Sequence, residues 1–487
     1  MAPTRFFLRL LARLVLSIPA AAVFAAAPAP RPNIIFILAD DLGYGEVGCY
    51  GQQLIATPHL DRMAAEGMRF TQFYAGNTVC APSRSVLMTG QHTGHTRVRG
   101  NAGALGREAQ SLRPGDVTIA RVLQQAGYAT GLVGKWGLGE ENTEGDPRRH
   151  GFDYVFGFLN QTHAHNHFPS YVWRNSEKFP LANDLTKVGD AEGAGYSVKR
   201  LAYADDLLAE DALAFVASHR EKPFFLFFSM VTPHANNERA RALGDGNEVP
   251  DQGGYAGRPW NDSTKNHAAM VGRLDRDVGA LLDRLKQLGL DERTLVMFSS
   301  DNGPHREGGP DYDPAFFRAS GPLTGIKRSL TEGGIREPFI ARWPGKIKPG
   351  AVSGHVGYFG DLMATWAELA GATPPPAASL DSVSLVPTLL GRGAQARHDY
   401  LYWEFYEGGV SQAVLLDGHW KGLRLLTPAA PIKLFDLTTD LAEQTDVATK
   451  NPEVLQRISG IMQTAHVDNE YWKIDPNAPP VKKGKKK

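Results

Sequence analysis

The chain has 487 residues, of which 42% are hydrophobic and 21% are charged. These values are ordinary for globular proteins and exclude a disordered chain, a collagen and a protein with many membrane spans. Lys plus Arg and Asp plus Glu each number 52, but basic residues cluster at both ends. The chain between these two basic ends is therefore mildly acidic, which argues against nucleic-acid binding. Two cysteines are too few for a disulfide scaffold or a Cys-rich zinc site.

Residues 1–27 have the pattern of a secretory signal peptide. Three arginines precede the apolar run 14–24, and a small-residue cleavage site follows at 25–27. The alternative is a membrane anchor, but the run is too short to span a bilayer comfortably and contains Pro19. We expect an exported protein, periplasmic or secreted, with no membrane span in the mature chain.

Four later runs are continuously apolar, which suits strands buried on both faces. They are 33–39, 129–134, 224–231 and 294–300. Apolar residues at helical spacing lie between them, at 57–67, 118–127 and 267–289. Strands that alternate with helices predict an α/β fold with a mostly parallel central sheet flanked by helices.

The segment 370–378 is rich in Pro, Gly and Ala and reads as a linker. Beyond it, four short candidate strands and a helical pattern at 454–462 predict a smaller α+β C-terminal subdomain. The expected organisation is a signal peptide (1–27), an α/β catalytic domain (28–375), the C-terminal subdomain (376–475) and a disordered Lys-rich tail (476–487).

Polar residues follow each of the four apolar runs. They are Asp40 and Asp41, Lys135, His234, and Asp301 with Asn302. Parallel strands end at one edge of a sheet, where α/β proteins bind their ligands. An Asp pair after a strand is, taken alone, more often a helix cap. Combined with a second oxygen pair after another strand, it favours a site for Ca²⁺ or Mg²⁺, since zinc usually takes His or Cys ligands.

The segment from Cys80 to Gly90 reads Cys-Ala-Pro-Ser-Arg-Ser-Val-Leu-Met-Thr-Gly. Read from the residues, it is a cysteine on a turn followed by Arg84 at a helix start, which could bind an anion. A lone cysteine is usually a buried small hydrophobe. The pattern C-x-P-S-R followed by L-x-T-G, however, resembles the signature of the type I sulfatases of the alkaline phosphatase superfamily, which include arylsulfatases and N-acetylgalactosamine-6-sulfatase-like proteins.

The resemblance extends over nearly the whole mature chain. The matching blocks are 33–43, 134–136, 232–234, 301–303 and 325–338. It implies that a maturation enzyme converts Cys80 to Cα-formylglycine, whose hydrate, a gem-diol, attacks the sulfur of a sulfate monoester. A covalent sulfo-enzyme then forms and expels sulfate. The implied substrates are sulfated saccharides and aryl sulfates.

The resemblance also implies a role for each matching residue. Asp40, Asp41, Asp301 and Asn302, with formylglycine at position 80, would bind one Ca²⁺, or alternatively Mg²⁺. Arg84 would orient the formylglycine. Lys135 and Lys327 would contact sulfate oxygens, and His234 would protonate the leaving oxygen. If these roles hold, Cys80 is not disulfide-bonded and Cys49 is a free thiol.

One position departs from the family pattern. Many relatives have a histidine, proposed as the base that deprotonates the gem-diol, where this chain has Gly137. His95, which follows the helix of the nucleophile, is the candidate replacement, and His92 is the second choice. The alternative reading of both is a surface-loop histidine.

Three further histidines are candidate substrate contacts. His163 and His165 belong to a run with histidines at alternate positions, followed by Tyr171 and Trp173, which suit a sugar ring. A three-histidine zinc site and a polar exposed loop are the alternatives. His305 lies close in sequence to Asn302.

Two other functions remain open from the sequence. One is a phosphonate monoester hydrolase or phosphodiesterase of the same superfamily, although the Asp and Asn ligand set favours a sulfatase. The other is a non-catalytic protein that binds sulfated glycans. Gly137 favours that reading, and the intact motif at Cys80 argues against it.

Overall fold

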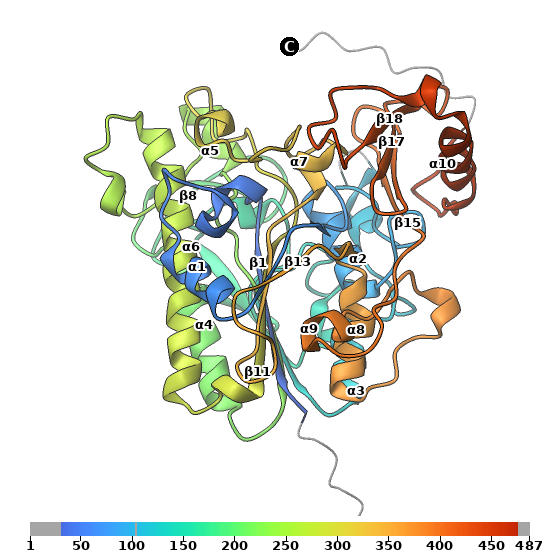
Figure 1. Ribbon diagram of the computed structural model, residues 1–487. Helices are drawn as coiled ribbons and strands as arrows, with labels where there is room; N and C mark the ends of the chain where they lie inside the picture. Colours follow the sequence, from blue (N-terminus) through green and yellow to red (C-terminus); the bar gives the residue numbers. More distant parts are fainter. Residues whose placement is uncertain (1–30, 103–104, 476–487) are drawn as a thin grey trace, which may run out of the picture. The chain divides into compact units, whose positions relative to one another are not determined.

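The computed structural model describes residues 31–102 and 105–475, which form a central sheet of ten strands flanked by helices (Figure 1). In spatial order the strands are β13 (Ala351–Ser353), β2 (Met68–Phe70), β12 (Phe339–Arg342), β11 (Thr294–Ser300), β1 (Asn33–Ala39), β10 (Phe224–Ser229), β4 (Ala129–Lys135), β5 (Tyr154–Phe158), β6 (Tyr171–Arg174) and β7 (Glu177–Pro180). The five strands from β11 to β5 run parallel. Antiparallel pairs extend the sheet on either side, and the edge strand β13 pairs in parallel with β2.

The four predicted apolar runs form the central parallel strands β1, β4, β10 and β11. All seven residues of β1 are buried, because this strand is covered on both faces. It pairs with β10 on one side and with β11 on the other, so that Ile34 lies opposite both Phe225 and Leu295. The predicted α/β class is confirmed.

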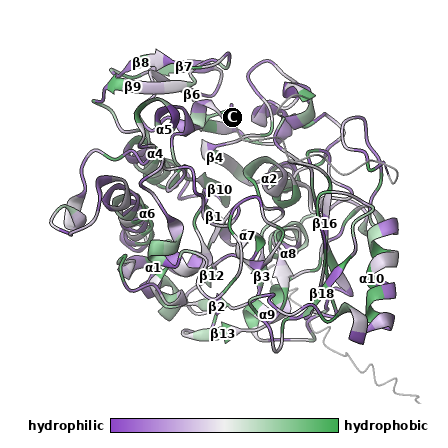
Figure 2. Ribbon diagram, turned by 90° about the horizontal axis from the view of Figure 1, so that it is seen from above, coloured by the Kyte–Doolittle hydropathy of each residue, from purple (hydrophilic) through white to green (hydrophobic). Residues whose placement is uncertain are grey.

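Alternate residues of β1 point into two different cores, one on each face of the sheet. Phe36 packs on the face covered by helices α2, α3 and α8, and Ile37 packs on the face covered by α1, α4 and α6. Figure 1 shows these two helical layers on opposite sides of the strands, and Figure 2 shows the same layers from above. The first layer comprises α2 (Cys80–Thr89), α3 (Ile119–Gln125) and α8 (Asp361–Ala370), and the second α1 (Pro58–Ala65), α4 (Ala204–Ser218) and α6 (Asp262–Gln287).

The predicted helices agree with α1, α3 and α6 apart from their ends. Helix α6 begins five residues earlier than the pattern predicts, because the Asn261 side chain accepts a hydrogen bond from the Thr264 N–H and caps the helix. Shorter elements complete this part of the chain. They are β3 (Phe73–Tyr74) with β14 (Gly357–Tyr358), the hairpin β8 (Asp184–Lys187) with β9 (Gly195–Lys199), and the helices α5 (Asn237–Leu243), α7 (Glu332–Ile335) and α9 (Val386–Leu390).

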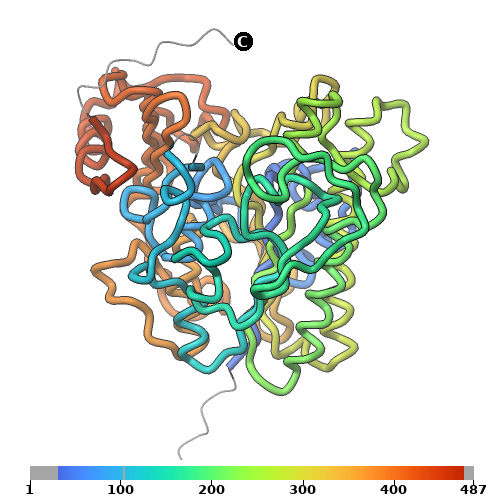
Figure 3. Tube along the Cα trace, turned by 180° about the vertical axis from the view of Figure 1, so that it is seen from behind, coloured from blue at the N-terminus to red at the C-terminus, as the bar shows by residue number. Residues whose placement is uncertain are grey.

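A separate antiparallel sheet forms the C-terminal part, as predicted, and appears in orange and red in Figure 3. Its strands are β15 (Tyr400–Phe405), β16 (Ser411–Leu416), β17 (Trp420–Arg424) and β18 (Lys433–Asp436), and α10 (Pro452–Thr464) covers one face. Alternation separates the faces: Trp403 packs toward the main core, whereas Tyr402 packs under α10. The domain boundary at residue 375 stays a prediction, and the predicted signal peptide and tail lie outside the described residues.

A buried ion pair connects the C-terminal sheet to helix α7 of the α/β part. Lys421 of β17 is fully buried, and its Nζ lies 2.7 Å from Oε1 of Glu332 in α7 and 3.7 Å from Oε1 of Glu443. Glu332 also accepts a hydrogen bond from the hydroxyl of Tyr74. The ammonium group therefore balances two buried carboxyl groups between the two sheets.

Substituting Lys421→Met is expected to lower the free energy of unfolding by about 3 kcal/mol, because buried Glu332 keeps only Arg336, 3.2 Å away, and buried Glu443 loses the Lys421 ammonium. Urea denaturation followed by circular dichroism measures this loss. Lys433→Met on the neighbouring strand is the matched control, since Lys433 is exposed. An equal effect of the two substitutions would contradict the prediction.

No helix within residues 31–102 and 105–475 is both long and apolar enough to cross a membrane.

Candidate active site

The carboxyl ends of the central strands bring the predicted polar residues together. Asp40 and Asp41 follow β1, Asp301 and Asn302 follow β11, and Lys135 ends β4. All five side chains belong to buried residues. Asp41 has a positive φ of 67°, which turns the chain at the end of β1 so that both aspartates belong to the same cluster.

Each carboxylate of this cluster is paired with a cation. Lys135 Nζ lies 2.5 Å from Asp40 Oδ2, and Lys327 Nζ lies 2.7 Å from Asp41 Oδ2. Arg84 donates two hydrogen bonds to Asp301 Oδ2, of 3.0 and 2.8 Å. Three cations thus balance three carboxylates that would otherwise be costly to bury together.

Arg84 is held from a second direction as well. Its Nη1 donates to the backbone carbonyl of Lys135 at 2.7 Å and to the hydroxyl of Ser229 at 2.5 Å. The guanidinium is fully buried and has a fixed orientation. It therefore connects helix α2 to the ends of strands β4, β10 and β11.

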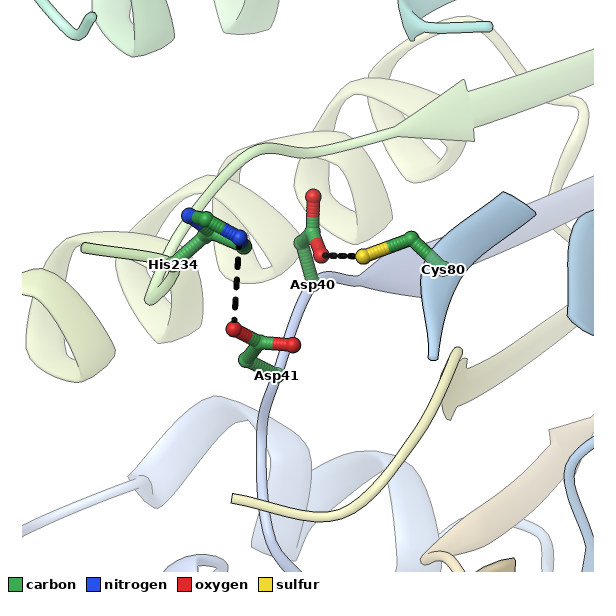
Figure 4. A group of neighbouring side chains, drawn as sticks. All are labelled: Asp40, Asp41, Cys80 and His234. Atoms are coloured by element: carbon green, nitrogen blue, oxygen red, sulfur yellow. Dashed lines mark hydrogen bonds and ion pairs between the residues drawn. The ribbon is translucent and has the colours of Figure 1, made fainter. Parts of the chain in front are cut away.

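Cys80 is the first residue of α2 and is completely buried. Its Sγ lies 3.3 Å from Asp40 Oδ1, as Figure 4 shows. Burial and the charge of Asp40 raise the pKa of the thiol well above its usual value. Cys49 and Cys80 are both free, so no disulfide joins them.

The oxygen atoms of the cluster fit a hard divalent cation. Asn302 Nδ2 donates to Asp41 Oδ1 at 2.7 Å, which fixes the orientation of the amide. Asn302 Oδ1 is buried and has no hydrogen-bond partner among the residues that the structure describes. An orphaned carbonyl oxygen beside three carboxylates needs a cation or another donor.

The pKa values of the carboxyl groups show how crowded the cluster is. Burial, followed by the charge of Asp40, raises the pKa of Asp301 to about 7. Burial likewise raises the pKa of Asp41 to about 6. Burial opposes ionisation of Asp40 too, but the Lys135 ammonium and other nearby cations outweigh it and hold the pKa of Asp40 well below its usual range. Additional positive charge would favour the ionised form of all three.

His234 lies next to Asp41, with its Nε2 3.4 Å from Asp41 Oδ2 (Figure 4). Its Nδ1 lies 2.7 Å from the carbonyl oxygen of Ala235, so Nδ1 carries the proton. Nε2 can then accept a hydrogen bond from Lys327 Nζ, 3.1 Å away. Burial and the Lys327 charge hold the pKa of His234 well below its usual value.

A cavity of about 540 Å³ opens beside these groups. His234 and Lys327 line its floor, and Arg107 and Arg241 belong to its exposed rim. His165 also lines it and stacks on His234, with ring centroids 4.7 Å apart. The Nδ1 atom of His165 is held at 3.0 Å by Glu238. The structure therefore places His165 at the cavity, where a substrate could reach it.

Gly137 lies on the wall of the same cavity. Its carbonyl accepts a hydrogen bond from Gln110 Nε2 at 2.9 Å. A Cβ atom at this position would lie 3.0 Å from Gln161 Oε1, so an amide side chain occupies the adjacent space. Amides do not act as bases near neutral pH.

The structure places neither His95 nor the second choice, His92, at the cavity that His234 lines, so the role of either as the missing base stays a prediction. Cys80 begins α2, whereas both histidines follow its last turn, about 13 Å away along a helix of ten residues. His95 Nδ1 lies 2.9 Å from Asp381, and its ring stacks on His92. His92 lines a different cavity from the one that His234 lines, and His95 lines neither of these two cavities.

Substituting His95→Ala is therefore expected to change kcat/KM for an aryl sulfate by less than about twofold, because the ring is exposed and remote from Cys80. Steady-state kinetics measures the effect. His165→Ala is the informative comparison, since it removes the ring that stacks on His234 and is expected to lower kcat/KM. A large loss with His95→Ala would contradict the placement.

Two of the three predicted substrate contacts lie outside the 540 Å³ cavity. His305 is fully buried, and its ring nitrogens engage the Pro233 carbonyl at 3.0 Å and the Glu307 N–H at 3.1 Å. Burial lowers its pKa to about 3, so it is a neutral core residue. His163 is buried against Phe158 and lies outside the 540 Å³ cavity. The segment His163–His165 is a 3-10 helix, so its histidines do not share one face of a strand.

Sequence reasoning did not single out Glu307. Its Oε2 lies 2.8 Å from Lys327 Nζ, and its Oε1 accepts a hydrogen bond from Arg328. Glu238, the partner of His165, and Ser229, the partner of Arg84, were also missed. No local motif marks these residues, because their partners are distant in sequence.

Comparisons with known proteins agree on one family. The family model described as "Sulfatase" matches residues 32–372, and a second model, "N-sulphoglucosamine sulphohydrolase, C-terminal", matches residues 326–466. N-acetylgalactosamine-6-sulfatase of Canis lupus familiaris is 34% identical over 84% of this chain and 74% of its own length. Arylsulfatase A of Homo sapiens is 33% identical over 89% of this chain and 87% of its own.

The crystal structure of Ps i-CgsB in complex with k-i-k-neocarrahexaose superposes with a TM-score of 0.73 at 26% identity. The match covers 92% of this chain and 94% of that one.

Proposed function

The chain belongs to the sulfatase family and is a sulfate-ester hydrolase, and from this premise we propose that it releases sulfate from sulfated saccharides, and also from aryl sulfates, through formylglycine formed at Cys80. The observation that carries the proposal is the placement of Cys80. It begins α2 at the centre of a buried cluster in which Asp40 contacts its Sγ and three cationic side chains lie around it. Such a cluster suits an anion and a nucleophile side by side.

The formylglycine hydrate would supply an oxygen nucleophile that can later expel sulfate. Position 80 suits it, because the side chain points from a helix start into the cluster rather than into the core. Arg84, fixed by Asp301 and Ser229, would keep this position oriented. Conversion of Cys80 to formylglycine requires a maturation enzyme, and we propose that this enzyme acts on the chain in the exporting cell. We also propose export to the periplasm or outside the cell.

Asp40, Asp41, Asp301 and Asn302 would hold a calcium ion, or alternatively magnesium, at the orphaned Asn302 oxygen. The ion would supply positive charge that stabilises the sulfate group during attack. The residues of the chain make the other contributions. Lys135 and Lys327 bring ammonium groups to opposite sides of the cluster, where they can contact sulfate oxygens.

His234 and Lys327 are placed to protonate the leaving oxygen. Lys327 donates toward Nε2 of His234, and both side chains line the cavity. A proton on this pair can pass to an alcohol or phenol oxygen that departs into the cavity. Glu307 and Asp41 both contact the Lys327 ammonium, at 2.8 and 2.7 Å, and would thereby position it.

The shape of the site favours a sugar over a small aryl group as the natural substrate. The cavity is lined mainly by polar side chains, including Asn101, Gln110, Gln161 and His165. Such donors and acceptors match the hydroxyl groups of a saccharide. The curated relatives named above include an N-acetylgalactosamine-6-sulfatase, which supports the same substrate class.

Parallel assays with one leaving group test the proposal against a phosphonate monoester hydrolase or phosphodiesterase. We expect kcat/KM for 4-nitrophenyl sulfate to exceed the values for the corresponding phenyl phosphonate and phosphodiester. Higher values for either phosphorus ester would favour the alternative. No turnover of any ester, with formylglycine present at position 80, would favour a non-catalytic glycan-binding protein.

A further inference from the structure

His167 is a buried histidine that the proposed hydrolysis does not use. It is the third histidine of the run that begins at His163, and the residue is 1% exposed. Its ring lies beside that of Tyr203, with centroids 5.8 Å apart and an angle of 18° between the planes. His167 does not line the 540 Å³ cavity, so it can affect the reaction only through another residue.

Both ring nitrogens of His167 face hydrogen-bond acceptors. Nδ1 lies 2.6 Å from Oδ2 of Asp205 in the first turn of α4, and Nε2 lies 2.8 Å from the backbone carbonyl oxygen of His234. A carboxylate and a carbonyl only accept, so both nitrogens carry protons and the ring is an imidazolium. Burial opposes this charge, but the Asp205 carboxylate outweighs it and raises the pKa of His167. Hydrogen bonds from a charged donor are roughly twice as strong as neutral ones.

The bond from His167 fixes one peptide plane of the loop that carries His234. The accepting carbonyl belongs to the peptide between His234 and Ala235. The next peptide is held by the Asn236 N–H, which donates to the Gly246 carbonyl at 2.7 Å. The carbonyl of that second peptide, on Ala235, accepts the hydrogen bond from Nδ1 of His234. Because peptides are planar, the two contacts together determine where this acceptor lies, and with it the direction of Nε2.

Glu248 ties the same two segments together a second time. Its side chain is fully buried, and Oε2 accepts hydrogen bonds from the backbone N–H of His167 at 3.3 Å and from Nδ2 of Asn236 at 2.8 Å. Asp205 and Glu248, like His167, do not line the cavity. A chain of contacts therefore runs from α4, through the ring of His167, to the backbone of His234, outside the reach of substrate.

We propose that His167, held by Asp205, is a positioning residue that directs Nε2 of His234 at the leaving oxygen of the ester. It acts through the backbone of His234 and exchanges no proton with substrate. The inference rests on the proposed function, because it takes His234 as a residue that protonates the leaving oxygen. A poorly directed His234 is most costly for a poor leaving group, since a weakly acidic alcohol or phenol needs that proton most.

The test compares two esters on the full chain: 4-nitrophenyl sulfate, and phenyl sulfate, whose leaving phenol is the weaker acid. The kcat/KM values are expressed per formylglycine, measured by peptide mass spectrometry. We expect His167→Leu to lower kcat/KM about threefold for 4-nitrophenyl sulfate and about 30-fold for phenyl sulfate, so that their ratio changes about tenfold. A general loss of folded protein would lower both values by the same factor.

His398→Leu is the matched control, because His398 also pairs with a buried aspartate in the first turn of a helix. Its Nε2 lies 2.7 Å from Asp361 of α8, and neither residue lines the cavity. It should leave the ratio of the two esters unchanged. If His167→Leu fails to fold because Asp205 is left buried without its cation, adding Asp205→Leu replaces the whole pair by apolar groups, and the same change in ratio is expected.

Equal proportional losses for the two esters in the folded variants, or the same selective loss in His398→Leu, would overturn the positioning role. Hydrolysis by the unsubstituted enzyme tests the proposed function separately. An active enzyme whose ratio does not respond to His167 would overturn the positioning role alone. An enzyme with formylglycine that turns over neither ester would overturn both, because no leaving oxygen would then need a proton.

Discussion

Substituting Cys80→Ala is expected to lower kcat/KM for 4-nitrophenyl sulfate by roughly 10⁴-fold or more, the scale seen when a nucleophile is removed. The residual rate should be small because Asp40, Lys135 and Lys327 can still bind sulfate but have no attacking atom to assist. Stability should change by only about 1 kcal/mol, since the substitution removes one buried sulfur atom. Steady-state kinetics and circular dichroism separate the two effects.

Peptide mass spectrometry of the exported wild-type protein is the companion measurement. Conversion of Cys80 replaces the CH₂–SH group by an aldehyde, so sulfur is lost, whereas ordinary thiol oxidation adds oxygen and retains sulfur. Cys49→Ala is the control, because Cys49 is half-buried and burial together with Asp61 raises its pKa to about 12, which keeps it an unreactive thiol. An active enzyme whose Cys80 peptide keeps its sulfur would refute the formylglycine proposal.

The sequence predicts the central fold well for a physical reason. A strand covered by helices on both faces must be apolar at every position. Apolar residues fill most positions of the four strands β1, β4, β10 and β11. Their polar ends then have to meet at one edge of the sheet. Asp40 and Asp301 therefore lie together although 261 positions separate them in the sequence, and both contact Arg84.

The same reasoning fails where side chains follow a helix or a loop. His95 is close to Cys80 in sequence, but helix α2, which begins at Cys80 and ends at Thr89, separates it from the site. His305 is close to Asn302 in sequence, yet its ring is buried and forms hydrogen bonds with the Pro233 carbonyl and the Glu307 N–H. Sequence separation does not predict on which side of a buried loop a ring will point.

Gly137 presents a different case, because the structure offers no direct substitute for a base there. Gln161 and Gln110 occupy the adjacent space, and their amides hydrogen-bond to each other at 3.2 Å. The titratable side chains that line the same cavity are His165, Glu108, Glu140 and Glu238, among others. His165 is already held by Glu238 and stacked on His234, so it is the group whose removal would show whether a cavity histidine assists proton transfer.

Substituting Asn302→Leu is expected to abolish stabilisation by calcium. In the unsubstituted protein, calcium at 100 times its Kd should add about 2.7 kcal/mol to the free energy of unfolding, because it binds only the folded chain. Leucine has a similar volume but removes both the orphaned oxygen and the hydrogen bond to Asp41. Thermal denaturation with EGTA and then with added Ca²⁺ measures the difference, and magnesium is compared at the same concentration.

The control is Asn266→Leu, which removes a half-buried amide that donates to Asp245 at 3.1 Å on α6, away from the cluster. It should leave the calcium-dependent rise in melting temperature unchanged. Activity should follow the same pattern: EGTA and Asn302→Leu should each lower kcat by at least about 10²-fold, in line with the loss of charge stabilisation in a buried site. If Asn302→Leu kept the full rise with calcium, the cation would have to bind elsewhere, and the three carboxylates would then be balanced by Arg84, Lys135 and Lys327 alone.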